Sequence, residues 1–523
     1  MWVDGEQAVV VAAMLAFFAV NLLGQMFVFN QTSLGEYKAR EGSVPTKAKD
    51  EIWREHEGVP VARPKESPII ARKREEYKGR TVTWAEVNKH SARDDLWIVC
   101  EGKVFDVTKF VERHPGGWRP IVHMSDRDAT DVMNEFHPAA VFDKWMPNYY
   151  IADLADYKES ELLADYRAIR QELLGRGFFR NSRSYYFAKY LWLASIFVPT
   201  LYGVLMCTST FAHMLSAAGL ALFWQQLAFV GHDLGHNSVS HVLELDYFWG
   251  SLIGDFLGGI TLSWWKLSHN THHCVCNSVE HDPDIQHLPV FAISEKLFGK
   301  FWSTFHQKYF VTDAIARLLV SYQHLLYVPI MMVARFNLYV QSTILLFTRE
   351  KVAYRAYEIA SIAGFWTWYT LFISCLPSWQ EKVCYLLISH GLAGMLHIQI
   401  TISHFSMDTF HGISEDDWIR HQMATTMNVD CAPYMDWFHG GLQFQLEHHL
   451  FPRLTRRNLR VARARVLELA AKHDLNYVEM DFPKAFERLH NTLYGTALQA
   501  RKLKKGDAGF YHSPLWEGLN AQG

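Results

Sequence analysis

Four apolar runs constrain this chain more than any other feature of its sequence. They cover about 186–207, 211–231, 357–377 and 383–403, and each is long enough to cross the roughly 30 Å hydrocarbon core of a bilayer as a helix. The loop between the first two, 208–210, is uncharged, which favours the side of the membrane away from the cytosol. The sequence therefore predicts a multi-pass membrane protein with an all-α domain of four core transmembrane helices.

Two further apolar runs are predicted to lie in the membrane interface instead of crossing. In the run 245–265, Asp255 sits near the middle, where a charge costs about 2.5–3.5 kcal/mol on insertion scales. The run 325–347 contains Arg335 and Asn337. With four crossings, the chain returns to the face from which it started, so the histidine clusters described below all lie on one cytosolic face.

Another apolar run, at 7–29, has acidic residues before it and basic residues after it. A secretory signal has positive charge before its apolar core, so residues 1–30 are predicted to be an uncleaved transmembrane anchor. A cleaved or transit-type segment is the alternative. Residues 31–79 are charged, contain four prolines and are predicted to be a linker.

Histidines recur in three short clusters at helical spacing. Gln445, His448 and His449 lie at i, i+3 and i+4, so they project from one face of a helix. Two other clusters have similar spacing: His232 and His236, and His269, His272 and His273. Neutral imidazole is a ligand for iron, copper, nickel and zinc, and about eight ligands are too many for one tetrahedral zinc. The clusters therefore predict two metal ions side by side; ordinary core histidines are the alternative, but burying so many polar rings is costly.

Cysteine usage and net charge limit the alternatives. The seven cysteines are scattered and odd in number, unlike a secreted disulfide framework. Cys274 and Cys276 lie beside one histidine cluster, but thiolates suit zinc or iron–sulfur clusters better, so neither is predicted as a ligand. The near balance of 51 basic and 54 acidic residues gives no reason to propose a nucleic-acid partner.

A small α+β soluble domain is predicted over 80–155. Its runs 97–100 and 104–107 are rich in β-prone residues and are separated by Glu101-Gly102-Lys103, the pattern of a β-hairpin. The next segment, 156–184, is basic and amphipathic and is predicted to be a connector along the membrane surface. The membrane domain then covers 185–470, and 471–523 is predicted to be a cytosolic tail.

Two histidines of the α+β domain lie 23 positions apart: His114, which begins His-Pro-Gly-Gly, and His137. Glycines after His114 let the backbone approach a flat ligand closely, and two histidines can bind opposite faces of a haem iron. A plain turn at His-Pro-Gly-Gly is the alternative. His90 and His123 are predicted to lie at the surface.

Two irons on nitrogen and oxygen ligands, at a membrane surface and beside a haem electron donor, suit the activation of dioxygen. Such a centre can remove hydrogen from an unactivated methylene. The substrate must then be held in an apolar slot with one carbon facing the metals. Long-chain lipids are the expected substrates, because the transmembrane helices offer such a slot.

Residues 80–470 resemble the membrane-bound front-end desaturases with an N-terminal cytochrome b5 domain. The motifs that carry the resemblance are His-Pro-Gly-Gly at 114–117, His-Asp-Leu-Gly-His at 232–236, His-Asn-Thr-His-His at 269–273 and Gln-Leu-Glu-His-His at 445–449. The resemblance implies haem b with His114 and His137 as axial ligands, two non-haem irons, and a cytosolic histidine-rich cap on the membrane domain.

The resemblance also implies which residues bind the two irons. The expected ligands are His232, His236, His269, His272, His273, His404, Gln445, His448 and His449. Of these, Gln445 would bind through its amide oxygen or through water, and no catalytic residue is expected beyond the ligands. Asn277, Asp282 and Asp284 are expected to lie behind the ligands and orient the imidazoles; a capped turn is the alternative.

Within the family, the segments 282–294, 334–342 and 425–445 look most like sphingolipid Δ8 desaturases. That likeness implies a double bond at carbon 8 of the sphingoid base of ceramide, O2 as co-substrate and NADH-cytochrome b5 reductase as electron donor. It also implies an endoplasmic reticulum membrane location, with haem and iron facing the cytosol. A front-end acyl desaturase of Δ5 or Δ6 type is the main alternative; a lipid hydroxylase and a non-enzymatic haem electron carrier are two others.

Overall fold

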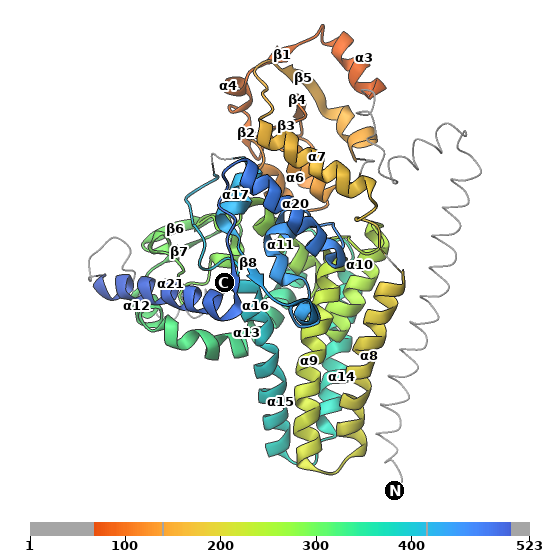
Figure 1. Ribbon diagram of the computed structural model, residues 1–523, viewed down its shortest axis with the longest axis vertical. Coiled ribbons are helices and arrows are strands. Elements are labelled where there is room, and N and C mark those ends of the chain that lie inside the picture. The colour runs from red at the N-terminus through yellow and green to blue at the C-terminus, as the bar shows by residue number, and fades with distance from the viewer. Residues whose placement is uncertain (1–66, 139–140, 182, 415–416, 504–523) are drawn as a thin grey trace, which may run out of the picture.

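The computed structural model describes residues 67–503 apart from 139–140, 182 and 415–416. The predicted anchor at 1–30 lies outside the described residues, as does most of the predicted linker. Figure 1 shows a small α+β domain stacked on a largely helical cap, with a bundle of long helices projecting from the far side of the cap. The predicted α+β domain fused to a mostly helical membrane domain is confirmed.

The α+β domain is built on a five-stranded sheet with strand order β1-β5-β4-β3-β2. The strands are β1 (Thr81–Val82), β2 (Ser91–Ala92), β3 (Asp95–Cys100), β4 (Lys103–Asp106) and β5 (Tyr150–Leu154). The predicted hairpin is confirmed, because β3 and β4 pair antiparallel up to Cys100↔Lys103. Its turn residues Glu101 and Gly102 have φ of 51° and 69°, as a tight two-residue hairpin turn requires.

Helices surround this sheet: α3 (Pro68–Glu76), α4 (Trp84–Val87), α5 (Trp118–Val122), α6 (Thr130–Phe136), and the turns η1 (Val111–Arg113), η2 (Val141–Trp145) and η3 (Met146–Tyr149). The α3 helix corrects the predicted linker, which extended to 79. Ile70 is buried in the core of the domain, and Arg74 Nε lies 2.7 Å from Asp153 Oδ2. Most residues of this helix are charged, so its composition does not indicate that one face is buried.

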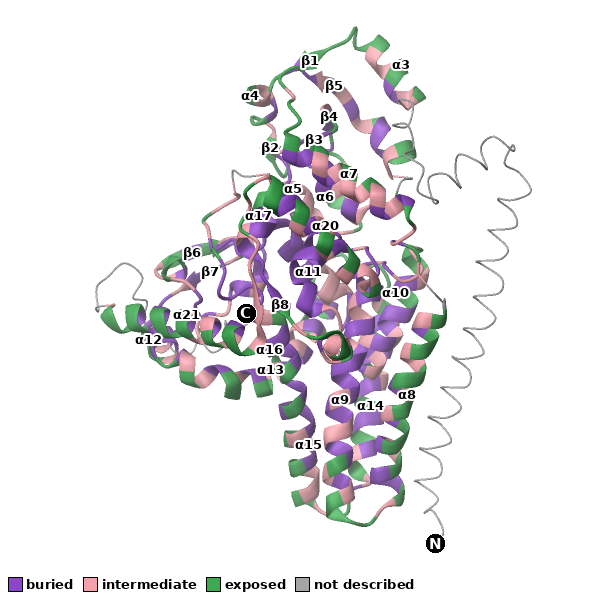
Figure 2. Ribbon diagram, in the orientation of Figure 1, coloured by how far each residue is buried: buried purple, intermediate pink, exposed green. Residues whose placement is uncertain are grey.

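Four long helices form the bundle in Figure 1: α8 (Arg183–Met206), α9 (Thr210–Gly235), α14 (Arg355–Ser374) and α15 (Trp379–Ala393). They coincide with the four predicted spans. Trp224 and Phe365 belong to the apolar cluster between them. Figure 2 shows exposed residues along the outside of the bundle, and many of these, including Phe187 and Phe211, are large and apolar. Such an outer surface is suited to lipid rather than to water.

Length and hydropathy alone select a different set of four candidate spans among the described residues. These are Ser184–Met206, Thr210–Gly235, Gln323–Phe347 and Trp379–Thr401, so α13 (Gln323–Phe347) replaces α14, and α16 (Met395–Thr401) extends α15. The α14 helix contains Glu358 and several Trp and Tyr residues, which lower its mean hydropathy. In Figure 1, α14 nevertheless stands within the bundle, whereas α13 lies across the end of the bundle nearest the cap. The interfacial position of 325–347 stays a prediction.

The run 245–265 is broken rather than continuous. Helix α10 (Leu243–Ser251) passes into a π-helical turn, η4 (Leu252–Leu257), and α11 (Leu262–Val275) begins after a turn. Asp255 Oδ1 accepts a hydrogen bond from Leu262 N at 2.7 Å and so satisfies a donor at the start of α11. The break agrees with the prediction that this run does not cross the membrane.

The cap is mostly helical, as predicted, and also contains short strands that the sequence did not indicate. Strands β6 (Lys300–Ser303) and β7 (Lys308–Val311) pair antiparallel, and β8 (Asn428–Asp430) pairs parallel with β9 (Glu479–Asp481). The remaining elements are α12 (Ala314–Ser321), α17 (Trp418–Thr425), α18 (Asp436–His439), α19 (Gln445–Leu450), α20 (Leu459–Lys472), α21 (Phe482–Lys502), η5 (Pro283–Ile285), η6 (Glu295–Leu297), η7 (Pro433–Met435), η8 (Leu442–Phe444) and η9 (Arg456–Asn458). Strands this short leave no alternating pattern in the sequence.

The predicted tail from 471 onward is also corrected. Its strand β9 pairs with β8, and its helix α21 buries Ala485, Leu489 and Leu493 in the core of the cap. The cap therefore extends to about Lys502 within the described residues. Charged residues lie between the buried apolar residues of α21. The average composition of the segment is therefore polar, as in an exposed tail.

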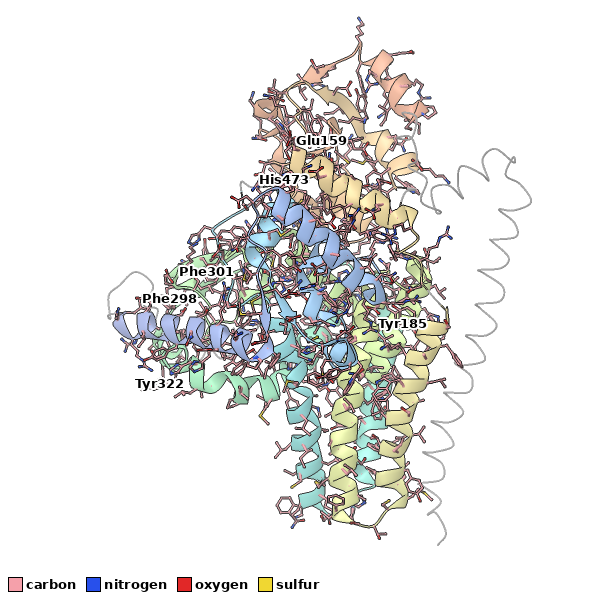
Figure 3. The ribbon with its side chains drawn as sticks, viewed as in Figure 1. Glu159, Tyr185, Phe298, Phe301, Tyr322 and His473 are labelled. Atoms are coloured by element: carbon pink, nitrogen blue, oxygen red, sulfur yellow. The ribbon has the colours of Figure 1, made fainter. Side chains whose placement is uncertain are left out.

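Helix α7 (Glu161–Gly175) corrects the prediction of a connector along the membrane surface. It packs between the α+β domain and α20 (Figure 1), where Arg167 Nε lies 2.8 Å from Asp131 Oδ1 and Arg170 Nε lies 2.5 Å from Glu135 Oε1. In Figure 3, Glu159 and His473 lie beside this helix, at the boundary between the two domains. Two of the basic residues predicted to face the membrane, Arg167 and Arg170, are therefore paired with acidic residues of the α+β domain.

His123 was predicted at the surface and is instead buried, with its ring centre 4.6 Å from that of His281 in the cap. Burial lowers its pKa to about 3, so the ring is neutral. The surface that buries it belongs to the other domain, and nothing in the local sequence marks such a contact. His90 is half-buried and stacks on Trp97 at 3.7 Å.

Candidate metal centre and haem site

The three histidine clusters meet at the end of the bundle nearest the cap. Helix α9 ends at the first cluster, α11 carries the second, α19 carries the third, and His404 follows α16. Of the nine predicted ligands, His232 is half-buried and the other eight are buried. The structure therefore brings together residues that are separated by more than 200 positions in the chain.

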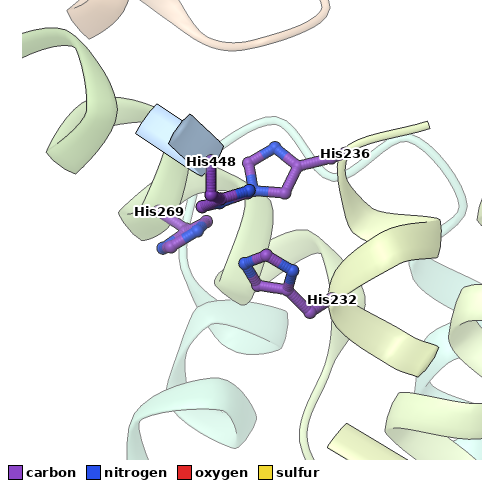
Figure 4. Close-up of side chains that lie close together, drawn as sticks. All are labelled: His232, His236, His269 and His448. Atoms are coloured by element: carbon purple, nitrogen blue, oxygen red, sulfur yellow. The ribbon is translucent and has the colours of Figure 1, made fainter. Parts of the chain in front are cut away.

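Four of the histidines form the first group, drawn in Figure 4: His232, His236, His269 and His448. One ring nitrogen from each lies within 4.8 Å of those of the others. The ring centres of His232 and His448 are 4.4 Å apart, and those of His236 and His448 are 4.7 Å apart. This spacing suits one metal ion held between several imidazoles.

The second group contains His272, His404, His449 and Gln445. The ring centre of His404 lies 4.7 Å from those of His272 and His449. Gln445 Nε2 lies 3.2 Å from His404 Nε2, so the amide belongs to the group. If the Gln445 amide is rotated by 180°, its oxygen Oε1 faces His404 Nε2 instead. Both atoms are then hydrogen-bond acceptors, so a cation is needed between them.

His273 lies between the two groups. Its Nε2 is 3.1 Å from His269 Nε2 and from His448 Nε2, and its ring centre is 4.1 Å from that of His449. Imidazole nitrogens this close need either a shared proton or a shared metal ion. The two groups are thus adjacent, as expected for two ions side by side.

Unpaired ring nitrogens test whether these residues fit metal ions. Among the described residues, buried atoms without a hydrogen-bond partner include His232 Nε2, His236 Nδ1 and Nε2, His273 Nδ1, His449 Nε2 and Gln445 Oε1. Buried polar atoms are nearly always paired, so a concentration of unpaired lone pairs at one place fits bound cations. The donor set is nitrogen with one amide oxygen, which suits iron.

Residues behind the second group fix the orientation of its rings. His272 Nδ1 lies 2.9 Å from Asp282 Oδ2, His404 Nδ1 lies 3.2 Å from Thr425 O, and His449 Nδ1 lies 2.7 Å from Gln422 Oε1. When Nδ1 donates its proton backward, Nε2 keeps its lone pair for a metal. The three rings therefore present Nε2 toward the centre of the group.

The structure places the predicted supporting residues as follows. Asn277 N donates to Asp282 Oδ2 at 2.6 Å, and Asn277 Nδ2 donates to His404 O at 3.0 Å. Asp284 accepts from Ser268 Oγ at 3.2 Å and lies 3.8 Å from His272 Nδ1. Asp282 therefore contacts a ligand ring directly, whereas Asp284 is more distant.

Sequence reasoning missed Gln422 and Thr425. No periodic signal marks Gln422 or Thr425, which come from α17 and meet the site only in the fold. Cys276 Sγ lies 3.4 Å from His404 Nδ1, and burial raises the pKa of its thiol. A neutral thiol is a poor metal ligand.

Burial and crowding keep most of the imidazoles neutral. For His236, His269 and His448, burial lowers the pKa well below its usual value, and the neighbouring imidazoles lower it further. His272 differs: burial opposes its charge, but the Asp282 carboxylate is close enough that its pKa is raised overall. Neutral imidazole is the form that binds metals.

Close packing holds the first cluster in place. A Cβ on Gly235 would lie 2.0 Å from Cζ3 of Trp265, so only glycine fits between the two histidines of this cluster. The Trp265 ring in turn packs against His232, His236 and His269 at centre distances of 5.3, 5.1 and 4.4 Å. Sequence reasoning did not single out Trp265.

The two histidines of the α+β domain face each other across a gap. Their ring centres are 5.9 Å apart, a separation that two metal–nitrogen bonds of about 2 Å each can span. His114 Nδ1 lies 2.6 Å from Gly117 O, and His137 Nδ1 lies 3.2 Å from Met133 O, so each ring directs Nε2 away from the backbone. A Cβ on Gly116 would lie 2.9 Å from His114 Cε1. The pair therefore fits a bis-histidine haem.

A cavity of about 540 Å³ reaches the metal groups from the membrane domain. Its lining includes six of the predicted ligands: His232, His269, His272, His404, Gln445 and His448. Its walls come from α9, α13 and neighbouring segments and include Trp224, Leu227, Phe291, Ile330, Leu338 and Leu396. The cavity is thus largely apolar and borders the candidate metal centre.

Comparison with known proteins identifies two families in this chain. Residues 209–480 match the fatty acid desaturase family, and residues 83–155 match the cytochrome b5-like heme/steroid binding domain. The first match covers the metal groups and the cavity. The second covers His114 and His137.

Similar proteins extend over nearly the whole described chain. The chain is 41% identical to Delta(8)-fatty-acid desaturase 1 of Arabidopsis thaliana over 86% of its own length and 100% of that protein. It is 40% identical to Acyl-lipid (9-3)-desaturase of Borago officinalis, over 84% of this chain and 98% of that protein. It is 32% identical to Delta 8-(E)-sphingolipid desaturase of Komagataella phaffii, over 80% and 94% respectively.

Proposed function

Because the chain belongs to the fatty acid desaturase family and carries a cytochrome b5-like domain in the same polypeptide, we propose that it desaturates a long-chain lipid at carbon 8 of the sphingoid base of ceramide. The reaction consumes O2, two electrons and two protons, removes two hydrogens from adjacent methylenes and releases two molecules of water. The observation that carries the proposal is the apolar cavity of about 540 Å³, whose lining includes six of the candidate iron ligands.

Two non-haem irons and one haem b are the proposed cofactors. The irons would be held by His232, His236, His269, His272, His273, His404, Gln445, His448 and His449, and the haem by His114 and His137. The irons, when bound, supply the oxidising chemistry, and the haem supplies electrons one at a time. Asn277, Asp282 and Asp284 support the ligands of the second group.

The protein's own residues position the lipid chain. The apolar walls around Trp224, Leu227 and Ile330 exclude water, and burial of each methylene is favourable by about 0.8 kcal/mol. A chain held along this cavity presents one pair of carbons to the histidines at its end, and orientation of this kind lowers the barrier by reducing the entropy lost at the reacting step. The position of the double bond then follows from how far the polar end of the lipid lies from the metal groups.

The relatives support carbon 8 and a sphingoid base, because several similar proteins carry Delta(8) or Delta 8-(E)-sphingolipid desaturase as their name. A second candidate is an acyl-lipid substrate of Δ5 or Δ6 type. The 40% identity to an acyl-lipid desaturase over almost the whole of that protein favours keeping it. The two candidates differ in substrate and share the same centre.

We further propose an endoplasmic reticulum membrane location, with both metal sites facing the cytosol and NADH-cytochrome b5 reductase as electron donor. The α+β domain and the cap lie at the same end of the helix bundle (Figure 1). A membrane around the bundle therefore leaves both sites on one side, where a soluble reductase domain can reach the haem.

Expression of the full chain in a yeast that lacks Δ8 sphingolipid desaturation tests the substrate. We expect new Δ8 double bonds in long-chain bases, detected by mass spectrometry of bases and fatty acids in parallel. New double bonds confined to fatty acyl chains would instead support the acyl-lipid candidate.

The variant His448→Ala tests the iron centre. It should abolish the product and lower non-haem iron while leaving the haem absorbance spectrum unchanged. His439→Ala is the matched control, since His439 is a buried histidine in the same stretch that belongs to neither metal group. Desaturation that survives in His448→Ala would show that the iron assignment is wrong.

A further inference from the structure

Helix α6 places Phe136 between the two metal sites. The helix ends at Phe136, and His137 follows directly. The ring centre of Phe136 lies 5.9 Å from that of His273 and 6.5 Å from that of His236. One aromatic side chain of the α+β domain thus contacts two histidines of the metal centre, while its backbone continues into a candidate haem ligand.

Contacts on both sides hold Phe136 in this position. On the haem side, the contact between His137 Nδ1 and Met133 O, at 3.2 Å, ties His137 to the same helix. On the cap side, Phe136 packs against an apolar cluster that includes Cys274 and Phe444. The ring is therefore wedged between the domains.

A second contact fixes the same helix against α19. The buried hydroxyl of Tyr166 lies 2.6 Å from Leu450 O and 3.2 Å from Glu135 Oε1. Glu135 precedes Phe136, and Leu450 follows His449. Tyr166 therefore positions Phe136 relative to the third histidine cluster without touching either metal site itself.

We propose that Phe136 is the bridge through which electrons pass from the haem to the non-haem iron, an inference that rests on the haem and iron assignments of the proposed function. In each transfer, the haem iron held by His114 and His137 is oxidised from ferrous to ferric, and one iron held near His236 and His273 is reduced from ferric to ferrous. No bond forms or breaks and no proton moves. An NADH-dependent flavoprotein reductase returns the haem to the ferrous state.

The physical reason for assigning the bridge to Phe136 is its continuous packing between the two sites. Electron transfer between two centres falls steeply when the path crosses a gap without packed atoms. Phe136 is covalently joined to a haem ligand at one end and lies against two iron ligands at the other. Among ring contacts between described residues, those of Phe136 with His236 and His273 alone join the α+β domain to the metal-centre histidines.

Two substitutions remove the ring and keep apolar bulk: Phe136→Leu and Phe136→Met. Phe136→Tyr keeps the ring. Phe110→Leu is the matched control, because the Phe110 ring also lies 5.9 Å from a haem ligand, His114, but has no ring contact with the metal-centre histidines among the described residues. His448→Ala sets the background rate of haem oxidation by O2 alone.

The measurement is stopped-flow absorbance of the haem in the purified full-length holoprotein, reduced with NADH and reductase and mixed with O2 and ceramide. We expect haem reoxidation to slow several-fold in Phe136→Leu and Phe136→Met and to keep the parental rate in Phe136→Tyr and Phe110→Leu. Haem spectrum, haem midpoint potential and non-haem iron content should stay at parental values in all four.

Three results would overturn the bridge. One is a parental reoxidation rate in Phe136→Leu or Phe136→Met. Another is equal slowing in Phe110→Leu, which would indicate a general effect on the haem pocket. The third is loss of haem or iron from both ring-removing variants, which would assign Phe136 to packing alone. Intact transfer without desaturation of the parental protein would refute the proposed substrate and leave the bridge standing.

Discussion

Gly235→Ala tests how tightly the first metal group is packed. A Cβ at this position would lie 2.0, 2.5 and 2.8 Å from three carbons of the Trp265 ring. Non-bonded carbons prefer separations of about 3.5–4.0 Å, so the ring has to move by about 1.5 Å. The variant therefore displaces Trp265, the residue whose ring packs against His232, His236 and His269.

The size of this shift decides the expected outcome. Alanine is favoured over glycine by about 0.5–1 kcal/mol in the middle of a helix, and Gly235, as the last residue of α9, gains at most this amount. Overpacking a filled site costs about 1–3 kcal/mol. Metal sites need their ligands held within about 0.5 Å, and a displacement of about 1.5 Å exceeds that. We expect Gly235→Ala to lose most of its non-haem iron and its product, whether Trp265 pushes the histidines apart or swings into the cavity.

Gly231→Ala is the matched control, one turn earlier on α9. The nearest atom to its added Cβ is Ile253 Cγ2 at 3.7 Å, an ordinary contact. Because Gly231 lines the cavity, the control is compared on iron content per haem, measured by elemental analysis. Parental iron content and product in Gly235→Ala would refute the packing argument; iron loss in Gly231→Ala would show that α9 tolerates no substitution here for another reason.

Three other substitutions probe the supports and the haem. Asp282→Asn removes the carboxylate behind His272 and should weaken iron binding about 10–100-fold in competition with a chelator; unchanged affinity would contradict a supporting role. Tyr166→Phe leaves the buried Leu450 carbonyl unpaired, which should destabilise the docked domains by about 1–3 kcal/mol, visible as a lower thermal midpoint; an unchanged midpoint would contradict it. His137→Ala should lose the bis-histidine haem spectrum and keep parental non-haem iron, and simultaneous loss of iron would show that the two sites do not fold independently.

Local spacing made the clustering of the candidate metal ligands predictable from the sequence. The i, i+3 and i+4 pattern of Gln445, His448 and His449 depends only on helix geometry, and α19 is helical over those positions. Four membrane crossings, an even number, then predicted that the histidine clusters lie on the same side of the membrane. In the fold they meet at the same end of the helix bundle. Each step used contacts within one helix or a count of crossings, which the sequence contains directly.

Contacts between distant segments were not predictable in the same way. Gln422, Trp265 and Phe136 have no periodic signal and gain their roles only from neighbours brought by the fold. The basic face of α7 was assigned to a membrane surface, because lipid headgroups and the carboxylates of Asp131 and Glu135 attract Arg167 and Arg170 equally well. Composition alone cannot distinguish between these partners.

The pairs at α7 bear on how the haem reaches the iron. Exposed ion pairs contribute about 0–1 kcal/mol, too little to fix one domain orientation, but breaking a buried pair costs about 3–5 kcal/mol. Glu135 is fully buried and pairs with Arg170, and Arg119, 4% exposed, pairs with Glu350 across the domain boundary at 2.8 Å. Separation of the domains would leave such charges unpaired or expose apolar surface around Phe136. The docked arrangement is therefore the stable state, and a haem bound in it would reduce the iron of its own chain at a rate independent of protein concentration.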